Sequence, residues 1–240
     1  MNVIVLHPTA SKESAEMLAG FLVCQASNPF QTGKRKYTEY DLVINYGCNR
    51  KLTTNAKINS ATAIARCIDK FATFSLLSKY NIPVPQYTLD KNIAATWQCV
   101  VVRAEKDGAM NAGMEYCFPK GKAARIPDAE LYTEYFDHKK EFRVVVLKNA
   151  IIACYEKVRE GEEWMFYERS YQYLQPVQQA CLDAATILKI DYVGFDVLVN
   201  KDNEFVILEA NSAPIITEDV MKAFRRIIKK MEKGIGNGAQ

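Results

Sequence analysis

Histidine is scarce in this chain, and the usual sequence patterns of metal and nucleophile sites are missing. Only His7 and His138 occur among 240 residues, too few for a histidine-based metal cluster. The seven cysteines are scattered and form no C-x-x-C pair, which argues against a zinc site. Their odd number, and the position of several within apolar runs, indicate reduced thiols and a cytoplasmic location.

The chain also lacks a strong charge of either sign and any long apolar run. Lys and Arg number 31 against 28 Asp and Glu, a net charge of +3, too small to indicate binding to nucleic acid or to a membrane surface. No apolar run approaches the roughly 20 residues of a membrane helix. Residues 1–10 contain no basic leader or cleavage site, so we expect no secretion.

A P-loop enzyme is excluded by a missing motif. The stretch QTGKRK (31–36) lacks the required glycine spacing. No Ser-His-Asp or Cys-His arrangement is found either.

The order of predicted elements divides the chain into an α/β start and a β-rich remainder. Buried strands at 2–6 and 40–47, with a helix near 13–24 between them, predict a small parallel α/β unit. A helix over 60–80 ends at the Pro-rich NIPVP, because proline resists helix continuation. The further predicted elements are strands at 99–104, 114–118, 131–136, 141–147, 150–158, 191–199 and 204–211, a helix at 176–189, and a last helix capped by Thr217.

The predicted hairpin at 191–211 has a polar end. Glu209 and Asn211 share a strand face because side chains alternate. A four-residue turn at 200–203 would place Asp196 opposite Ile207 and on the same face as Glu209 and Asn211. Three oxygen ligands, two of them anionic, suit Mg²⁺, with Mn²⁺ as the alternative.

The simpler interpretation of these residues is an acidic hairpin face that is exposed to solvent. However, Asp196 lies in the apolar strand YVGFDVLV, where a buried carboxylate requires a charged partner. Arg143, within FRVVV, likewise requires an anion opposite it.

Together these segments resemble the ATP-grasp carboxylate–amine ligases. GFDVLV (194–199) and FVILEANSAP (205–214) are similar to the family's metal-binding strands, with Asp on one strand and Glu-x-Asn on the next. Three further segments occur in the same order as in the family. They are residues 60–85 with their Asp-Lys pair, LYTEYF followed by EFRVVVL, and the helix that leads into the metal strand. The most similar subgroup is the RimK-type ligases, such as the enzyme that adds glutamate to a ribosomal protein.

The resemblance, which runs from about residue 60 to 215, implies a fold of mixed α/β and α+β class. This is the ATP-grasp fold, preceded by a small Rossmann-like α/β unit. The implied divisions are an N-terminal substrate-side unit (1–58), a helical connection (59–85), a small subdomain with a phosphate-covering loop at 105–113 (86–132), and a C-terminal subdomain with hinge and metal site (133–240).

The resemblance also implies the residues that bind the nucleotide. Lys70 would contact its phosphates, and Arg103 stands where the family usually has a second phosphate-binding lysine. That is a departure, because arginine is a planar fork rather than a point charge. Main-chain groups of the hinge would contact adenine, and an acid would lie near the ribose; these residues are Glu134, Tyr135 and Phe136 for the hinge and Glu141 for the ribose.

The catalytic and metal positions follow in the same way. Arg143 would stabilise the transferring phosphoryl group, and Lys157 and Arg159 compete for the place of a further family arginine. Asp196, Glu209 and Asn211 would bind the metal.

The implied function is an ATP- and Mg²⁺-dependent ligase that joins a carboxylate to an amine through an acyl phosphate, releasing ADP and phosphate. Metal and cationic side chains would stabilise its anionic transition state. The substrates would be small molecules, peptides or proteins, contacted by the loops 7–14 and 46–50 after parallel strands. The alternatives are a phosphotransferase acting on a hydroxylated small molecule and a catalytically impaired nucleotide-binding module.

Overall fold

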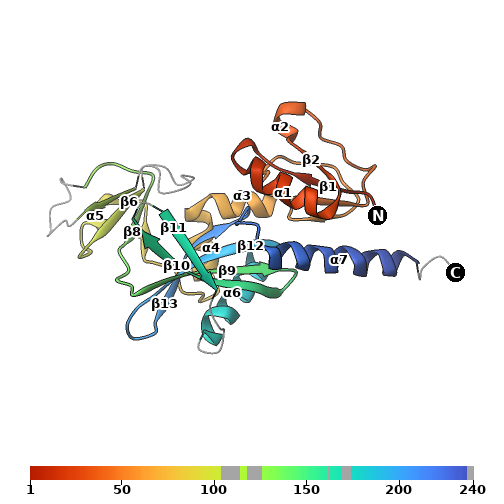
Figure 1. Ribbon diagram of the computed structural model, residues 1–240. Helices are drawn as coiled ribbons and strands as arrows, with labels where there is room; N and C mark the ends of the chain where they lie inside the picture. Colours follow the sequence, from red (N-terminus) through yellow and green to blue (C-terminus); the bar gives the residue numbers. More distant parts are fainter. Residues whose placement is uncertain (104–113, 118–125, 162, 169–173, 237–240) are drawn as a thin grey trace.

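Three β-sheets organise the chain, seen in a computed structural model that describes residues 1–103, 114–117, 126–161, 163–168 and 174–236 (Figure 1). No helix in this part of the chain is long and apolar enough to cross a membrane.

The N-terminal unit is a parallel sheet of strand order β2-β1-β3-β4. This confirms the predicted parallel α/β unit, although the short strands β2 and β4 were missed because neither contains an apolar run. Its elements are β1 (Val3–Leu6), the 3-10 helix η1 (Thr9–Ser11), α1 (Lys12–Leu22), β2 (Gln25–Ser27), α2 (Pro29–Thr32), β3 (Leu42–Asn45) and β4 (Lys57–Ile58).

Two helices, α3 (Ala61–Ile68) and α4 (Lys70–Lys79), occupy the region predicted as one helix. The helix breaks at Asp69, whose backbone is extended (φ −78°, ψ 101°) and whose carboxylate accepts a 2.9 Å hydrogen bond from the Ala72 amide. Asp69 therefore caps α4, a role that aspartate performs better than it continues a helix. The break places Lys70 at the first position of α4.

A small antiparallel sheet follows, of order β5-β8-β6-β7. Its elements are β5 (Tyr87–Thr88), α5 (Lys91–Ala94), β6 (Val100–Arg103), β7 (Met114–Cys117) and β8 (Leu131–Glu134). The loop predicted to cover phosphates, 105–113, lies outside the described residues.

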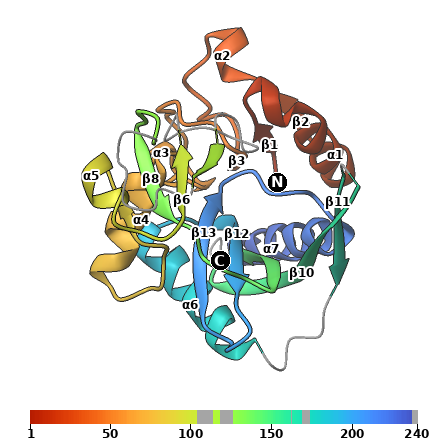
Figure 2. The ribbon, with the colours of Figure 1, turned by 90° about the vertical axis from the view of Figure 1, so that its left-hand side faces the viewer.

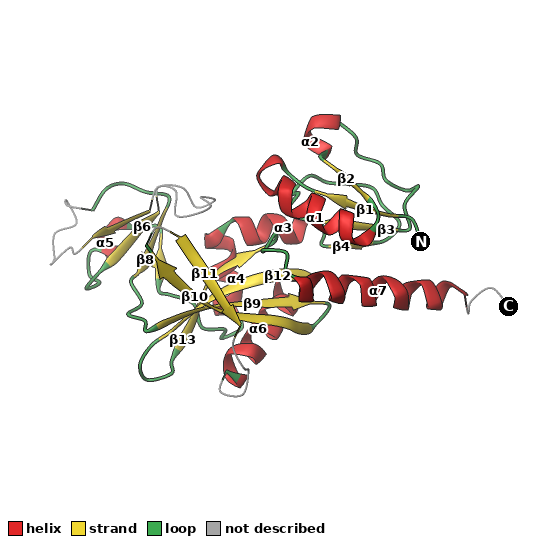
Figure 3. Cartoon of the chain, in the orientation of Figure 1, coloured by secondary structure: helices red, strands yellow, loops and turns green. Residues whose placement is uncertain are grey.

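The largest sheet is antiparallel, of order β11-β10-β9-β12-β13, and lies between the other two (Figures 1 and 3). One of its faces packs on α3, α4 and α6, and part of the other packs on α7 and the N-terminal unit. Its elements are β9 (Lys140–Leu147), β10 (Ala150–Glu160), β11 (Glu163–Glu168), α6 (Gln175–Leu188), β12 (Tyr192–Val199), β13 (Phe205–Asn211) and α7 (Glu218–Gly236). The predicted domain boundaries remain predictions.

The register of the β12–β13 hairpin, whose strands lie side by side in Figure 2, differs from the predicted one. Val199 pairs with Phe205, so the connection 200–204 has an odd length, and the predicted pairing of Asp196 with Ile207 is wrong. A bulge at Leu208 then shifts the register by one residue and sets Asp196 opposite Glu209. The bulge compensates for the odd connection, and the two carboxylates share a face as predicted.

Gly194 on β12 allows the chain after β13 to cross close above it. A Cβ at this position would lie 2.7 Å from the Pro214 Cβ, well inside van der Waals contact. Gly20 in α1 differs, because a Cβ there would meet nothing within 4 Å.

We therefore expect Gly194→Ala to lower the free energy of unfolding by about 1–3 kcal/mol through overpacking. Gly20→Ala should raise it by roughly 0.5–1 kcal/mol, because alanine is favoured in a helix interior. Urea unfolding of both variants tests this, and equal effects would show that the contact with Pro214 is unimportant.

Candidate functional site

The central sheet carries a charged half on one face. Along β9, Phe142, Val144 and Val146 point to the core with α6. Val145 and Leu147 point the other way, into the core with α7. Glu141 and Arg143 continue that second face beyond its apolar half.

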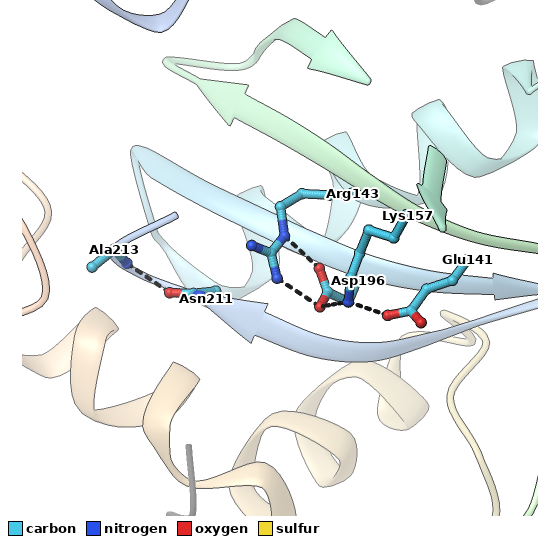
Figure 4. Close-up of polar contacts among 6 residues, drawn as sticks. All are labelled: Glu141, Arg143, Lys157, Asp196, Asn211 and Ala213. Atoms are coloured by element: carbon cyan, nitrogen blue, oxygen red, sulfur yellow. Dashed lines mark hydrogen bonds and ion pairs between the residues drawn. The ribbon is translucent and has the colours of Figure 1, made fainter. Parts of the chain in front are cut away.

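The charged half centres on the buried carboxylate of Asp196 (Figure 4). Arg143, opposite it on β9, donates from Nε to Oδ1 and from Nη2 to Oδ2, each at 2.7 Å. Lys157 on β10 donates to Oδ2 at 2.8 Å and also bonds Glu141. The predicted requirement that Asp196 and Arg143 each have a partner of opposite charge is met by the two residues themselves.

The ion pairs shift the pKa values of both central groups. Burial acts to raise the pKa of Asp196, but Arg143 and Lys157 outweigh it and lower that pKa below the ordinary value. Burial acts to lower the pKa of Arg143, but chiefly Asp196 reverses the effect and raises it. Both groups are therefore charged at neutral pH.

Two further predicted ligands lie beside this network. Glu209, directly opposite Asp196, is a third exposed and forms an ion pair with Lys70, with Nζ and Oε1 3.6 Å apart. Asn211 lies two residues further on the same strand, and its Oδ1 accepts a 2.9 Å hydrogen bond from the Ala213 amide. The structure thus brings together six predicted site residues, which are Lys70, Glu141, Arg143, Lys157, Asp196 and Glu209, with Asn211 at the end of the row.

Strand β11 adds two residues that the sequence reading missed. The Lys157 Nζ lies 4.8 Å from the centre of the Trp164 ring, and the Arg143 Cζ lies 5.4 Å from that of Phe166. Both aromatic rings therefore flank the cations of the site. The run WMFY, rich in residues that favour strands and following Gly161, was the available signal.

The competing residues Lys157 and Arg159 lie on the same face of β10 but in different surroundings. Lys157 is buried in the Asp196 network, whereas Arg159 is exposed, opposite Trp164. Within the described residues Arg159 makes no ion pair. The geometry favours Lys157 for a role next to Asp196.

The predicted hinge begins at Glu134, the last residue of β8. The amides of Glu134 and Tyr135 donate to the carbonyls of Gln86 and Cys99, each at 2.9 Å. Among the described residues, the Phe136 amide has no bonded acceptor. Arg103 lies buried at the end of β6 in the same small sheet.

The turn after Asn211 is anchored by the N-terminal unit. The Tyr46 hydroxyl donates to the Pro214 carbonyl, and burial raises the pKa of Tyr46 to about 12, so this donor stays protonated. A Cβ on Gly47 (φ +83°) would lie 2.9 Å from the Ala213 Cβ. The predicted substrate loop 46–50 therefore packs against the turn that follows the β12–β13 hairpin.

The chain matches a protein-family model over most of its length. Residues 51–234 match the model of the RimK-like ATP-grasp domain. The chain belongs to this family. The expected fold and the resemblance to ATP-grasp ligases are thereby confirmed.

A ligase is among the proteins with a similar sequence. A glutamate–LysW ligase, ArgX, from Sulfolobus acidocaldarius is 22% identical over 183 residues, which cover 65% of this chain and 64% of that protein. The chain therefore matches less than two thirds of that relative's length.

Solved structures of the same fold include two ligases. D-alanine–D-alanine ligase from Bacillus anthracis, complexed with ATP, superposes with a TM-score of 0.67 at 15% identity, covering 91% of this chain and 88% of that one. The ATP-grasp ligase PsnB, complexed with a minimal precursor, gives 0.65 at 14% identity, covering 90% and 92%. At these identities the likeness shows the fold.

The residues present fit a magnesium ion by chemistry and by face. Asp196, Glu209 and Asn211 offer three oxygen donors from one hairpin face, the donor type that Mg²⁺ prefers. Among the described residues no three His, Cys, Asp or Glu side chains gather as a metal cluster; the donor set of the hairpin has two carboxylates and the carboxamide of Asn211. Both oxygens of Asp196 already bond Arg143 and Lys157, so Asp196 would share its oxygens between metal and cations.

The Asp196 network predicts a large effect of neutralising that carboxylate. Asp196→Asn removes the anion that bonds Arg143 and one of the two that bond Lys157, so the free energy of unfolding should fall by about 3–5 kcal/mol at neutral pH. Asp202→Asn, exposed in the hairpin connection, is the matched control and should change it by at most about 0.5 kcal/mol. Urea unfolding measures both, and similar small effects would contradict the stabilising role of the network.

Wild type and Asp196→Asn should also respond differently to acid. The pKa of Asp196 is lowered on folding, so its stabilising contribution is complete above the unfolded-state pKa of about 3.9 and is lost as pH falls through the folded-state pKa. The difference between wild type and Asp196→Asn should therefore be constant from about pH 7 to pH 5 and shrink below about pH 4. A gap that closes already near neutral pH would be inconsistent with a lowered pKa.

Proposed function

We propose that the chain is an ATP- and Mg²⁺-dependent ligase that forms an amide bond between a carboxylate and an amine through an acyl phosphate. The observation that supports this most directly is the joining of Arg143, Lys157 and Lys70 with Asp196 and Glu209 at one end of the central sheet, in a chain of the RimK-like ATP-grasp family. Cations there suit phosphate oxygens, and the acids suit a metal.

In this proposal the basic residues perform the phosphoryl-transfer part of the reaction. Arg143 and Lys157 lie in a buried setting, where charges stabilise a developing oxyanion more strongly than they do in water. Lys70, at the first position of α4, and Arg103, at the end of β6, would approach the phosphates from the helical connection and the small sheet. Bound Mg²⁺ would neutralise phosphate charge and orient the terminal phosphoryl group.

The nucleotide base would bind at the hinge. Within the described part of the chain, the Phe136 amide has no bonded acceptor, whereas those of Glu134 and Tyr135 donate to Gln86 and Cys99. The acyl phosphate then needs only an incoming amine, with phosphate as leaving group. ADP and phosphate are the coproducts.

Incubating the chain with Mg-ATP, amino acid pools and hydroxylamine tests the reaction class. We expect ADP release that depends on an amino acid, together with a trapped hydroxamate. ADP release with a phosphorylated product and no hydroxamate would instead identify a phosphotransferase. Absence of nucleotide binding in calorimetry would overturn the assignment of the site.

Variants of the hairpin sharpen the test. Glu209→Gln should lower kcat by about 10²-fold or more, because it removes an anionic ligand that acts on the transition state. Glu204→Gln, on an exposed residue of the same hairpin, should leave kcat unchanged. Equal activity of the two variants would exclude Glu209 from the reaction.

A further inference from the structure

A cavity of about 470 Å³ lies in the N-terminal unit, away from the residues of the Asp196 network. Its walls come from β3, β4 and the connection between them, and from the start of α3 with the two residues before it. This volume lies within the range of small-molecule sites, and the carboxyl ends of parallel strands are where open α/β sheets bind ligands.

Asn45 and Asn59 are buried polar members of the lining, and we refer to them as its floor. Asn45 exchanges two hydrogen bonds with the main chain of Cys48, at 2.9 and 3.1 Å. Asn59 donates to the Tyr192 carbonyl at 2.8 Å and accepts from the amides of Asp191 and Tyr192. Both side chains are fixed by these bonds, so the floor is preformed.

The rim supplies unused hydrogen-bond donors. Lys51 and Lys57 are exposed and, within the described residues, neither takes part in an ion pair. The amides of Ala61 and Thr62, in the first turn of α3, have no bonded acceptor in the described part of the chain. The Ser60 Oγ accepts from Ala63 at 3.1 Å and keeps its own hydrogen for donation.

The lining contains no acidic residue to balance these donors. Its charged members are the two lysines, and its other polar members are asparagine, serine and threonine. Both lysines would repel a cationic ligand, whereas an oxyanion would bond them and the amides of α3 together.

We infer that this cavity is an oxyanion-binding site, which takes a carboxylate or a phosphate group between Lys51, Lys57 and the first turn of α3. The site is distinct from the nucleotide site of the proposed function and does not depend on the ligase reaction. The cavity adjoins the candidate functional site through loop 46–50. Tyr46 follows Asn45 in the chain, and its hydroxyl bonds the Pro214 carbonyl.

Calorimetric titration of the full chain tests this inference with four probes: L-glutamate, a triglutamate peptide, inorganic phosphate and a trilysine peptide. We expect at least one anionic probe to bind and trilysine not to bind. The Lys51→Glu/Lys57→Glu variant should weaken anion binding by at least about 10-fold, because it removes charge-assisted hydrogen bonds. Preference for glutamate or triglutamate identifies a carboxylate ligand, and preference for phosphate a phosphate ligand.

The matched control is Lys79→Glu/Lys201→Glu, which makes the same change of net charge at two exposed positions outside the cavity. It should leave anion binding within about twofold of wild type. Mg-ADP affinity should be unchanged in both variants, so failure of the cavity and failure of the proposed function are separable. The inference would be overturned if the control variant lost anion binding, or if the Lys51→Glu/Lys57→Glu variant bound anions as well as wild type does. A wild type that binds no anionic probe would overturn it too.

Discussion

The structure depends on one buried carboxylate held by two cations. Asp196 is 4% exposed, and a charge so placed is tolerated only with close partners of opposite sign. The bidentate bond from Arg143 and the third bond from Lys157 supply them, and Glu141 in turn balances Lys157. The four residues carry two positive and two negative charges, so the network is neutral. In the proposed reaction, a nucleotide adds negative charge to this neutral cluster, and a divalent cation entering with it offsets part of that charge.

The sheet that carries the network explains why it lies where it does. The face of β9 that bears Phe142 is apolar from Phe142 to Val146, and these residues pack the strand against α6. The opposite face is apolar only at Val145 and Leu147, beneath α7 and the N-terminal unit, and charged beyond Arg143. The charged residues therefore begin where the covering elements end. A strand anchored on both faces at one end holds the charged side chains of its other end rigidly, as an electrostatic site requires.

Arg143 and Asp196 could be predicted to need partners, because each is a charged residue within a strand whose neighbouring residues are apolar and buried. The hairpin register could not be predicted, because the bulge at Leu208 depends on how β13 packs as an edge strand rather than on its composition. The helix break at Asp69 was missed for a related reason. Aspartate is compatible with a helix interior and with a cap, and only the packing of α3 and α4 decides between them.

What the sequence conceals most is contact between distant segments. Tyr46 bonds the Pro214 carbonyl across 168 positions, and Phe166 reaches Arg143 from a strand whose exposed residues give no periodic signal. By contrast, Glu209, Asn211 and Pro214 lie within six positions, so the proposed metal ligands and the turn that ends their strand could be recognised together. The shared face of neighbouring residues on one strand is therefore predictable from sequence. The residues that enclose the same site come from other elements, and their part in it follows only from the fold.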